Sequence, residues 1–147
     1  MSIHVTRSED ETHAVARAFA ATLAAGDVVL LSGMLGAGKT AFVRGMSAGL
    51  GIDPGEVSSP TFTLIHEYRG GRLILYHADL YRLDGAATDD LGLEEMGAAD
   101  GVLAVEWPER LAHDMPAAIP VTIEITGDTD RRITIGPRNQ GPVHSIR

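Results

Sequence analysis

One glycine-rich segment, Gly33–Thr40 with the sequence G-M-L-G-A-G-K-T, constrains this 147-residue chain more than any other feature. It matches the pattern G-x-x-x-x-G-K-[ST], in which glycines let backbone amides curl around a phosphate group. The apolar run Val28–Leu31 precedes it and predicts a central strand that is buried on both faces. A helix is expected from Lys39 to Leu50. A strand, a glycine-rich turn and a helix N-terminus in this order form an anion-binding site, so the segment predicts a P-loop that holds a nucleoside triphosphate.

Two side chains of this segment carry the chemistry that a P-loop requires. Lys39 is the only lysine among the 12 lysine and arginine residues, and a compact ammonium fits between two phosphates where a planar guanidinium does not. We expect Lys39 to reach the β- and γ-phosphates of ATP, and the Thr40 hydroxyl to ligate Mg²⁺. The cofactor-binding residues predicted from the loop are Leu35, Gly36, Ala37, Gly38, Lys39, Thr40 and Ala41.

Magnesium chemistry also requires a carboxylate across the site from Thr40, and two acidic residues end apolar runs of the sequence. Glu106 follows Val102–Val105, and Asp79 closes Leu73–Asp79. The carboxyl ends of strands face the ligand in sheets of this kind. We assign Glu106 to Mg²⁺, directly or through water. We assign Asp79 to orienting or activating the attacking water, or to holding a metal-bound water, and the two roles can be exchanged.

Three further residues lie close to these patterns. Thr61 follows Ser58-Ser59-Pro60 ahead of a predicted strand, where a threonine can sense the γ-phosphate and metal, although a turn with polar caps fits the same residues. Trp107 is the only tryptophan. It is expected to be partly buried in the core, with stacking near the nucleotide or anchoring of a partner protein as alternatives. His77 is expected to be a hydrogen-bonded strand residue and not a catalyst.

The N-terminal part of the chain predicts a short strand at Ile3–Thr6 and then a helix. Ser8–Glu11 resembles a capping box, which supplies side-chain partners for the free amides at a helix start. Gly26 is expected to cap the end of this helix. The spacing of its apolar residues predicts a buried face made of Val15, Ala18, Phe19, Thr22 and Leu23.

Two hairpins are predicted further along. Gly70-Gly71 has the composition of a two-residue turn between Phe62–Arg69 and Arg72–Asp79, and a second hairpin should close around residues 127–130. The predicted fold class is therefore α/β. We expect a single-domain P-loop NTPase at residues 1–136, whose mixed sheet combines central parallel strands with antiparallel hairpins and is flanked by helices. Residues 137–147 are expected to be a flexible C-terminal tail.

The composition excludes several classes of protein. The chain has no cysteine, which removes disulfides, zinc–thiolate sites and cysteine nucleophiles. Its net charge is −8, and such a surface repels nucleic-acid backbones, so we expect contact with RNA only through partner proteins. The N-terminus lacks a signal peptide's apolar core, and no apolar run is long enough to cross a bilayer. We expect a cytoplasmic protein without membrane contact.

Taken together, four stretches of the sequence resemble the TsaE family, also called the YjeE family, of small ATPases in bacterial tRNA threonylcarbamoyladenosine modification. Their order and spacing agree with the family from about Ser8 to Ile135. The middle two are the most specific, because few other P-loop proteins have them. The four stretches are Leu35–Thr40, Ser59–Leu64, Tyr76–Leu83 and Val105–Arg110.

The resemblance implies a function within a complex. The protein would act with TsaB and TsaD, which transfer a threonylcarbamoyl group to the adenosine beside the anticodon, and would hydrolyse ATP to reset that assembly between turnovers. It would not carry out the transfer itself. The resemblance also implies that Thr61 belongs to a switch and that Trp107 lies in the site. It implies that Arg131, or its neighbour Arg132, is a basic residue near the nucleotide. Ala41 departs from the family, which often has a second threonine there, so its side chain offers no hydroxyl to the α-phosphate.

Three other functions fit parts of the sequence. A small-molecule kinase would need a lid with several arginines, and no arginine cluster occurs between Leu83 and Gly101. A GTPase that reads guanine through Asn-Lys-x-Asp is excluded, because the only lysine is Lys39 and the only asparagine is Asn139. A nucleotide-gated binding module without useful turnover remains as an alternative, because no residue clearly serves as an arginine finger.

Overall fold

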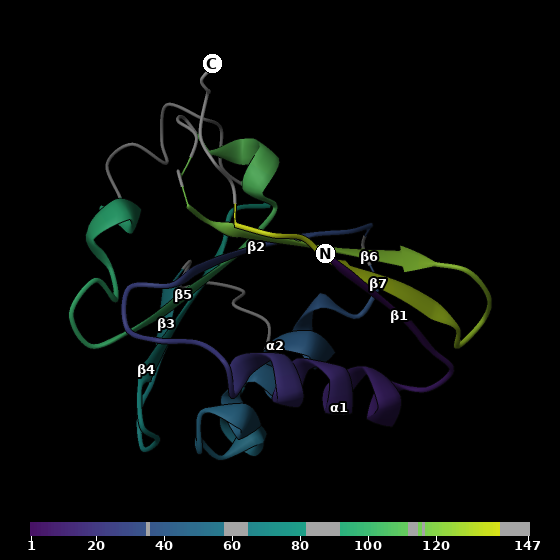
Figure 1. Ribbon diagram of the computed structural model, residues 1–147, viewed down its shortest axis with the longest axis horizontal. Helices are drawn as coiled ribbons and strands as arrows, with labels where there is room; N and C mark the ends of the chain where they lie inside the picture. The colour runs from purple at the N-terminus through teal and green to yellow at the C-terminus, as the bar shows by residue number, and fades with distance from the viewer. Residues whose placement is uncertain (35, 58–64, 82–91, 112–114, 116, 139–147) are drawn as a thin grey trace.

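The computed structural model describes residues 1–34, 36–57, 65–81, 92–111, 115 and 117–138, which form one mixed β-sheet with two α-helices (Figure 1). The strand order in the described part is β1-β7-β6-β2-β5-β4-β3. The helices are α1 (Glu9–Ala20) and α2 (Lys39–Gly49). The strands are β1 (Ser2–Thr6), β2 (Val28–Ser32), β3 (Ile65–Tyr68), β4 (Ile74–Asp79), β5 (Gly101–Glu106), β6 (Ile119–Ile125) and β7 (Arg131–Ile135).

Parallel pairing is confined to the middle of the sheet. β2 pairs in parallel with β5 and β6, and β5 pairs in parallel with β4. The outer pairs β3–β4, β6–β7 and β1–β7 are antiparallel. The prediction of a mixed sheet with a parallel centre and antiparallel hairpins is therefore confirmed. Because β2, β4, β5 and β6 run the same way, the loops that follow them emerge at one edge of the sheet.

Both α-helices lie side by side on one face of the sheet (Figure 1). Their close approach depends on two glycines of α2. A Cβ atom on Gly45 would lie 2.5 Å from the His13 carbonyl oxygen, and one on Gly49 would lie 2.4 Å from the Arg17 carbonyl oxygen. The α1 residues beside these glycines are the fully buried Ala16 and Ala20. Small side chains on both helices thus let the two backbones touch.

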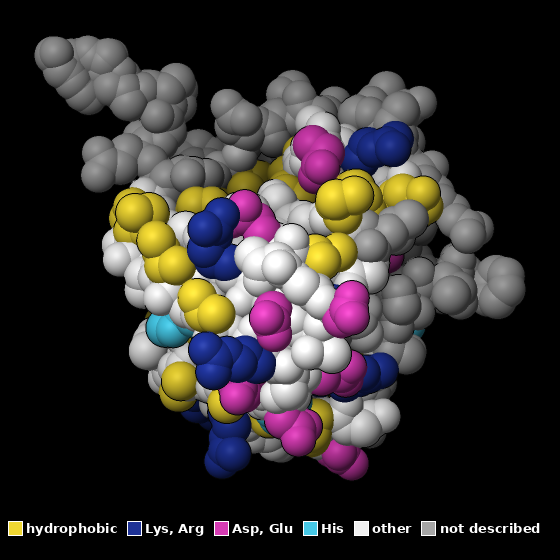
Figure 2. All heavy atoms as spheres, turned by 90° about the vertical axis from the view of Figure 1, so that its right-hand side faces the viewer, with side chains coloured by type: hydrophobic (Ala, Val, Ile, Leu, Met, Phe, Trp, Pro, Cys, Tyr) yellow, Lys and Arg dark blue, Asp and Glu magenta, His cyan; other side chains and the backbone are white. Residues whose placement is uncertain are grey.

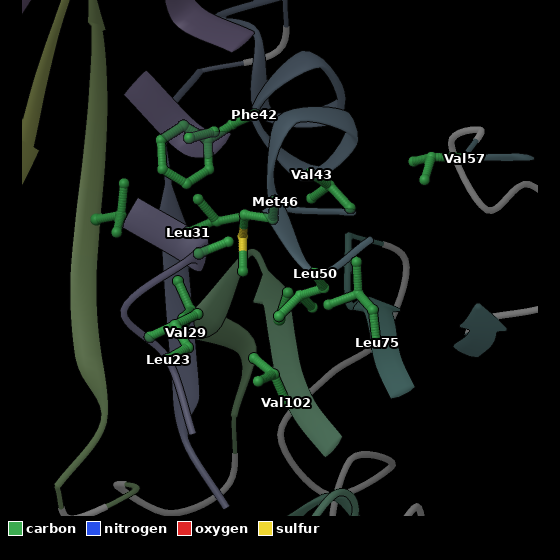
Figure 3. Close-up of a cluster of buried hydrophobic side chains, with 14 of the residues drawn as sticks. Leu23, Val29, Leu31, Phe42, Val43, Met46, Leu50, Val57, Leu75 and Val102 are labelled. Atoms are coloured by element: carbon green, nitrogen blue, oxygen red, sulfur yellow. The ribbon is translucent and has the colours of Figure 1, made fainter. Parts of the chain in front are cut away.

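The main core lies between these helices and the sheet (Figure 3). Phe42 and Met46 from α2 point toward Val29 and Leu31 of β2, and all four are fully buried. A second, smaller cluster covers the other face. It is built around Leu103 and Val105 of β5 and includes Leu80, Leu93 and Met115. β2 is therefore buried on the face of Val29 and Leu31 and only partly buried on the face of Val28 and Leu30, so the prediction of burial on both faces is confirmed in part.

The helix α1 begins as its sequence predicts, but the face that it buries is only partly the predicted one. Ser8 Oγ accepts a hydrogen bond from the Glu11 amide at 3.1 Å, and Glu11 Oε1 accepts one from the Arg7 amide at 2.8 Å. Of the predicted buried face, Ala18 and Thr22 are exposed, whereas Ala16 and Ala20 are buried. The prediction was wrong for Ala18 and Thr22, whereas Leu23 is buried and Val15 and Phe19 pack, partly buried, against the main core. Apolar spacing does not predict the buried alanines, because they depend on the glycines of α2, which admit only small partners.

Two turns of the structure also differ from the predicted ones. Gly26 does not cap α1, whose C-cap is Ala21. Instead Gly26, at φ +94°, donates its amide to the carbonyls of Gly97 and Gly101 in the approach to β5. The connection between β3 and β4 runs from Arg69 to Leu73 and is not a two-residue turn. It is held against α2, because the Arg72 amide donates to the Leu50 carbonyl at 2.8 Å.

Within the described ranges, neither helix has the length and apolar character that a membrane crossing requires. At the C-terminal end, Arg138 forms an ion pair with Asp27 at 2.7 Å, and residues 139–147 lie outside the described part. The division into a domain at residues 1–136 and a tail remains a prediction.

Candidate functional site

The glycine-rich segment connects β2 to α2, as the sequence predicts. Gly36 and Gly38 adopt φ values of +79° and +106°, a left-handed conformation that is strained for any residue with a Cβ. Gly38 is the N-cap of α2, and no described side chain caps this helix end. The first amides of α2 therefore remain available to an anion at the positive end of the helix dipole. Leu35, also predicted to bind phosphate, lies outside the described residues.

Lys39 is the first residue of α2 and is only 5% exposed. Its Nζ donates a hydrogen bond to the Gly33 carbonyl at 2.5 Å and lies 3.6 Å from the centroid of the Trp107 ring. Burial lowers the pKa of the ammonium group, and the nearby carboxylates of Glu106, Asp79 and Glu109 oppose that shift. The ammonium is thus held at the mouth of the loop by one carbonyl and one aromatic ring.

Both predicted carboxylates reach the same edge of the sheet. Asp79 and Glu106 end β4 and β5 and face each other in the parallel register. Asp79 Oδ1 accepts the Tyr81 amide at 3.0 Å, so this side chain also caps the following turn. Burial raises the pKa of Asp79, and repulsion from Glu106 adds to that effect against the Tyr81 amide, His77 and Lys39. The Lys39 ammonium of the loop interacts electrostatically with both of these carboxylates.

Glu106 has a partner that the sequence does not reveal. It is 3% exposed, and its Oε2 lies 2.5 Å from Nε2 of His77, which is fully buried. His77 is a hydrogen-bonded strand residue, as expected, but the partner is the carboxylate predicted to hold the metal. Nothing in the sequence signals this contact, because the two residues are 29 positions apart on different strands.

Trp107 follows β5 directly and adopts φ 60° and ψ 54°, a left-handed conformation that is uncommon outside glycine. This turn places the indole between two groups. The Lys39 ammonium lies over the ring, and the Tyr81 ring lies at a centroid distance of 4.8 Å. Partial burial was expected and is observed, and the indole packs against the smaller apolar cluster. Backbone strain at this position is a feature of functional sites.

The structure distinguishes the two adjacent arginines. Arg131 donates from Nε to the Ala37 carbonyl at 2.9 Å and from a terminal nitrogen to the Gly36 carbonyl at 3.3 Å. Its other terminal nitrogen contacts three carbonyls of the β6–β7 turn. Arg132 instead pairs with Glu124 on the surface through two contacts of 3.0 Å. Arg131 therefore ties the phosphate loop to the β6–β7 turn, and Arg132 does not reach it.

A pocket of about 170 Å³ opens beside the loop. Gly36, Ala37, Gly38 and Ala41 form one wall. The other walls come from the start of α1 and from the β6–β7 turn, and sequence reasoning assigned no role to most of these residues because they are distant from the motif in the chain. They are Ser8, Glu9 and Thr12 at the start of α1, Asp128 and Thr129 of the turn, and Arg131 at the start of β7.

The oxygen donors of the site suit Mg²⁺. No hydrogen-bond partner for Glu106 Oε1 or for the Thr40 hydroxyl occurs among the described residues. In the same part of the chain, no three histidine or acidic side chains cluster as a preformed metal cage. Mg²⁺ needs no such cage, because it binds through one or two protein oxygens together with phosphates and water. Thr61 lies outside the described residues.

Comparison with known proteins identifies relatives of the whole chain. The sequence model of the family described as "Threonylcarbamoyl adenosine biosynthesis protein TsaE" matches residues 6–134. A protein named tRNA threonylcarbamoyladenosine biosynthesis protein TsaE from Bacillus subtilis (strain 168) is 45% identical over 130 residues, which cover 88% of this chain and 81% of the relative. A protein of the same name from Treponema pallidum (strain Nichols) is 41% identical over 133 residues, covering 89% and 97%. The crystal structure of YdiB from Bacillus subtilis matches with a TM-score of 0.77 at 37% identity, over 94% of this chain and 86% of that one.

Proposed function

The chain belongs to the TsaE family of tRNA threonylcarbamoyladenosine biosynthesis proteins, and from this premise we propose that it binds ATP with Mg²⁺ and hydrolyses it. One observation carries the proposal. The Lys39 ammonium, the uncapped amides of α2 and the carboxylates of Asp79 and Glu106 all meet at one edge of the sheet. A triphosphate tail and its metal need these groups in one place.

The proposed division of labour follows the position of each group. The loop amides and Lys39 bind the β- and γ-phosphates, while Thr40 and Glu106 hold Mg²⁺. When bound, the metal neutralises charge on the phosphate oxygens. Asp79 positions the attacking water or a metal-bound water, and exchange of this role with Glu106 remains open. For Thr61, we retain the proposal of a switch residue that senses the γ-phosphate.

The nucleoside is proposed to enter the pocket between the loop and the β6–β7 turn. Ala41 lies in its wall and offers only a backbone amide to the α-phosphate, because its methyl group cannot donate. Arg131 supports this wall by holding the outward carbonyls of Gly36 and Ala37. The side chain of Trp107 is placed to sense whether Lys39 has engaged a phosphate.

Turnover by the isolated protein is proposed to be slow. An arginine finger must direct free guanidinium donors at the transferring phosphoryl group. Arg131 is the described arginine beside the loop, and backbone carbonyls already occupy its donors. This arrangement keeps a nucleotide-gated binding module as the second candidate, because a complete binding site does not by itself supply a fast catalyst.

The proposed partners are TsaB and TsaD, whose assembly the protein would reset between turnovers by ATP hydrolysis, in the cytoplasm where tRNA is modified. Direct binding of tRNA is not part of the proposal. Figure 2 views the molecule from the side where the β6–β7 hairpin projects in Figure 1. Acidic, basic and hydrophobic groups are interspersed there, without a broad basic area among the described residues. Together with the net charge of −8, this surface favours contact with RNA only through partner proteins.

Binding measurements with matched variants test the site. Lys39→Ala should weaken ATP binding by roughly 10- to 150-fold, because a charge-assisted hydrogen bond contributes about 1.5–3 kcal/mol. Glu106→Ala should impair hydrolysis more than binding, and Arg132→Ala serves as the control outside the site. If both site variants bind and hydrolyse ATP like the parent, the proposed site is wrong. Equal competition by GTP would contradict the preference for adenine.

A capture experiment distinguishes the candidate functions. The immobilised protein is offered TsaB and TsaD with ATP, ADP or no nucleotide, and the Lys39→Ala variant is the control. Capture that depends on the nucleotide and is lost in the variant supports the proposal, and release on hydrolysis supports resetting. Transfer of labelled γ-phosphate to a small acceptor would indicate a kinase instead.

A further inference from the structure

We propose that His77 is a positioning residue, which holds the Glu106 carboxylate in the orientation that binds the metal. The inference rests on the proposed function, because it assumes that Glu106 is a ligand of Mg²⁺. It assigns a role to a buried polar side chain that the nucleotide site itself does not use. The contact that carries it is the 2.5 Å approach of His77 Nε2 to Glu106 Oε2.

The hydrogen-bonding role of His77 follows from its surroundings. The ring is fully buried, and its Nδ1 has no hydrogen-bond partner among the described residues. Because an ionised carboxylate oxygen can only accept, Nε2 donates the hydrogen bond to Glu106. One ring nitrogen thus holds the carboxylate, whereas the other has no hydrogen-bond partner in the described part of the chain.

The ring lies among largely apolar neighbours. On β4, His77 lies between His66 of β3 and Ala104 of β5 in the strand register. The Tyr68 ring lies at a centroid distance of 6.2 Å, and Ala104 and Tyr68 both belong to the main apolar core. An apolar side chain would fill this place without an orphaned nitrogen. Buried polar atoms are nearly always paired, so a core position that leaves one unpaired calls for a reason outside packing.

Glu106 supplies that reason. A glutamate side chain has several rotatable bonds, and fixing it costs conformational entropy when a ligand is bound. The hydrogen bond from His77 fixes Oε2 before any ligand arrives and leaves Oε1 without a described partner. Side chains that hold a metal ligand in this way commonly change metal affinity by about 10- to 100-fold when they are replaced.

Three substitutions separate positioning from packing. In His77→Gln, the side-chain amide nitrogen can occupy the place of Nε2 and donate to Glu106. In His77→Asn, the shorter side chain reaches only the place of Nδ1. His77→Leu fills the volume without any donor. Thermal unfolding of each variant establishes that it is folded, and the Gln and Asn pair provides the comparison if the Leu variant does not fold.

We measure the affinity of the protein–ADP complex for Mn²⁺, which serves as the probe for Mg²⁺. The paramagnetic resonance signal of free Mn²⁺ reports how much of the metal remains unbound. Binding of a fluorescent ADP analogue in the presence of EDTA reports nucleotide binding by the loop without a metal ion. We expect His77→Leu and His77→Asn to weaken Mn²⁺ binding about 10-fold or more and to change metal-free nucleotide binding less than about 2-fold. His77→Gln should recover most of the Mn²⁺ affinity.

A double-mutant cycle tests whether the effect passes through Glu106. With Glu106→Gln already present, His77→Leu should cause no further loss of Mn²⁺ affinity. Mn²⁺ binding that is unchanged in His77→Leu and His77→Asn, or that falls equally in all three variants, would overturn the positioning role while leaving the proposed function intact. If Glu106→Gln itself binds Mn²⁺ like the parent, then the metal role of Glu106 is wrong and this inference fails with it.

Discussion

The ammonium nitrogen of Lys39 lies 3.6 Å from the centroid of the Trp107 ring, so the lysine of the phosphate loop and the residue that follows β5 are direct neighbours. The same nitrogen donates to the Gly33 carbonyl at 2.5 Å. A cation over an aromatic ring contributes about 0.5–2 kcal/mol, depending on how far it is desolvated. A phosphate group offers Lys39 a stronger, charge-assisted interaction. Binding of a nucleotide should therefore draw the ammonium away from the indole.

The fluorescence of Trp107 tests this competition directly, because the chain has one tryptophan. We expect ATP with Mg²⁺ to change the emission in a saturable way, since the charge over the ring moves. In Lys39→Met, which has no ammonium, adding ATP should leave the emission nearly constant. An unchanged emission of the parent under conditions where calorimetry detects ATP binding would show that Lys39 stays on the ring.

Arg131 and Arg132 form a matched pair for testing how the loop is held. Arg131 contacts the carbonyls of Gly36 and Ala37, whereas Arg132 pairs with Glu124. Arg131→Ala should weaken ATP binding by roughly 10-fold. Hydrogen bonds from a charged donor contribute about 1.5–3 kcal/mol, and here they stabilise the loop conformation that binds phosphate. Arg132→Ala should change binding less than about 2-fold, since exposed ion pairs contribute little. Equal effects in calorimetric titrations would contradict the bracing role of Arg131.

The ionised Asp79 carboxylate should lower the free energy of unfolding of the protein. Burial and the neighbouring Glu106 raise its pKa, so the ionised carboxylate disfavours the folded state. This component of stability is present below the unfolded-state pKa and is lost as the pH rises through the folded-state pKa. Asp79→Asn keeps an oxygen that can accept the Tyr81 amide. Without nucleotide or metal, it should raise the free energy of unfolding by about 0.5–1 kcal/mol at neutral pH, a modest figure because the carboxylate is only partly buried.

The pH dependence separates this effect from a general gain in packing. Urea unfolding of Asp79→Asn and the parent should give the largest difference near pH 7, and the difference should narrow as the pH falls toward the ordinary Asp pKa of 3.8. A difference that stays constant with pH would show that the charge of Asp79 is not its cause.

The contact of the two helices gives a prediction about stability alone. Gly45→Ala adds a Cβ atom 2.5 Å from the His13 carbonyl oxygen. Although alanine favours a helix by about 1 kcal/mol over glycine, the clash should lower the free energy of unfolding by about 2 kcal/mol. Ala18→Gly, on the exposed side of α1, is the control and should cost only the propensity difference of about 1 kcal/mol. A stabilised Gly45→Ala in denaturant titrations would mean that the helices can separate freely.

Much of this protein is determined by short stretches of its sequence. The glycine pattern of Gly33–Thr40 predicts the loop, because only glycine adopts left-handed backbone conformations without strain. Alternating and continuous apolar runs predict the strands and the mixed sheet. The acidic residues that end two of those runs, Asp79 and Glu106, are predicted to meet because parallel strands present their carboxyl ends at one edge. All of these features depend on neighbouring residues and on rules of strand geometry.

The contacts that complete the site were decided by tertiary structure. His77 meets Glu106 across 29 positions, and Arg131 meets Ala37 across 94. Which face of α1 is buried was also decided this way, because the glycines of α2 select small partners over bulky ones. No local pattern encodes these pairs, since each depends on strand register and on the volume that neighbouring elements leave free. Short-range backbone preferences can be identified along the chain, whereas side-chain partners are fixed only when the separate elements pack together.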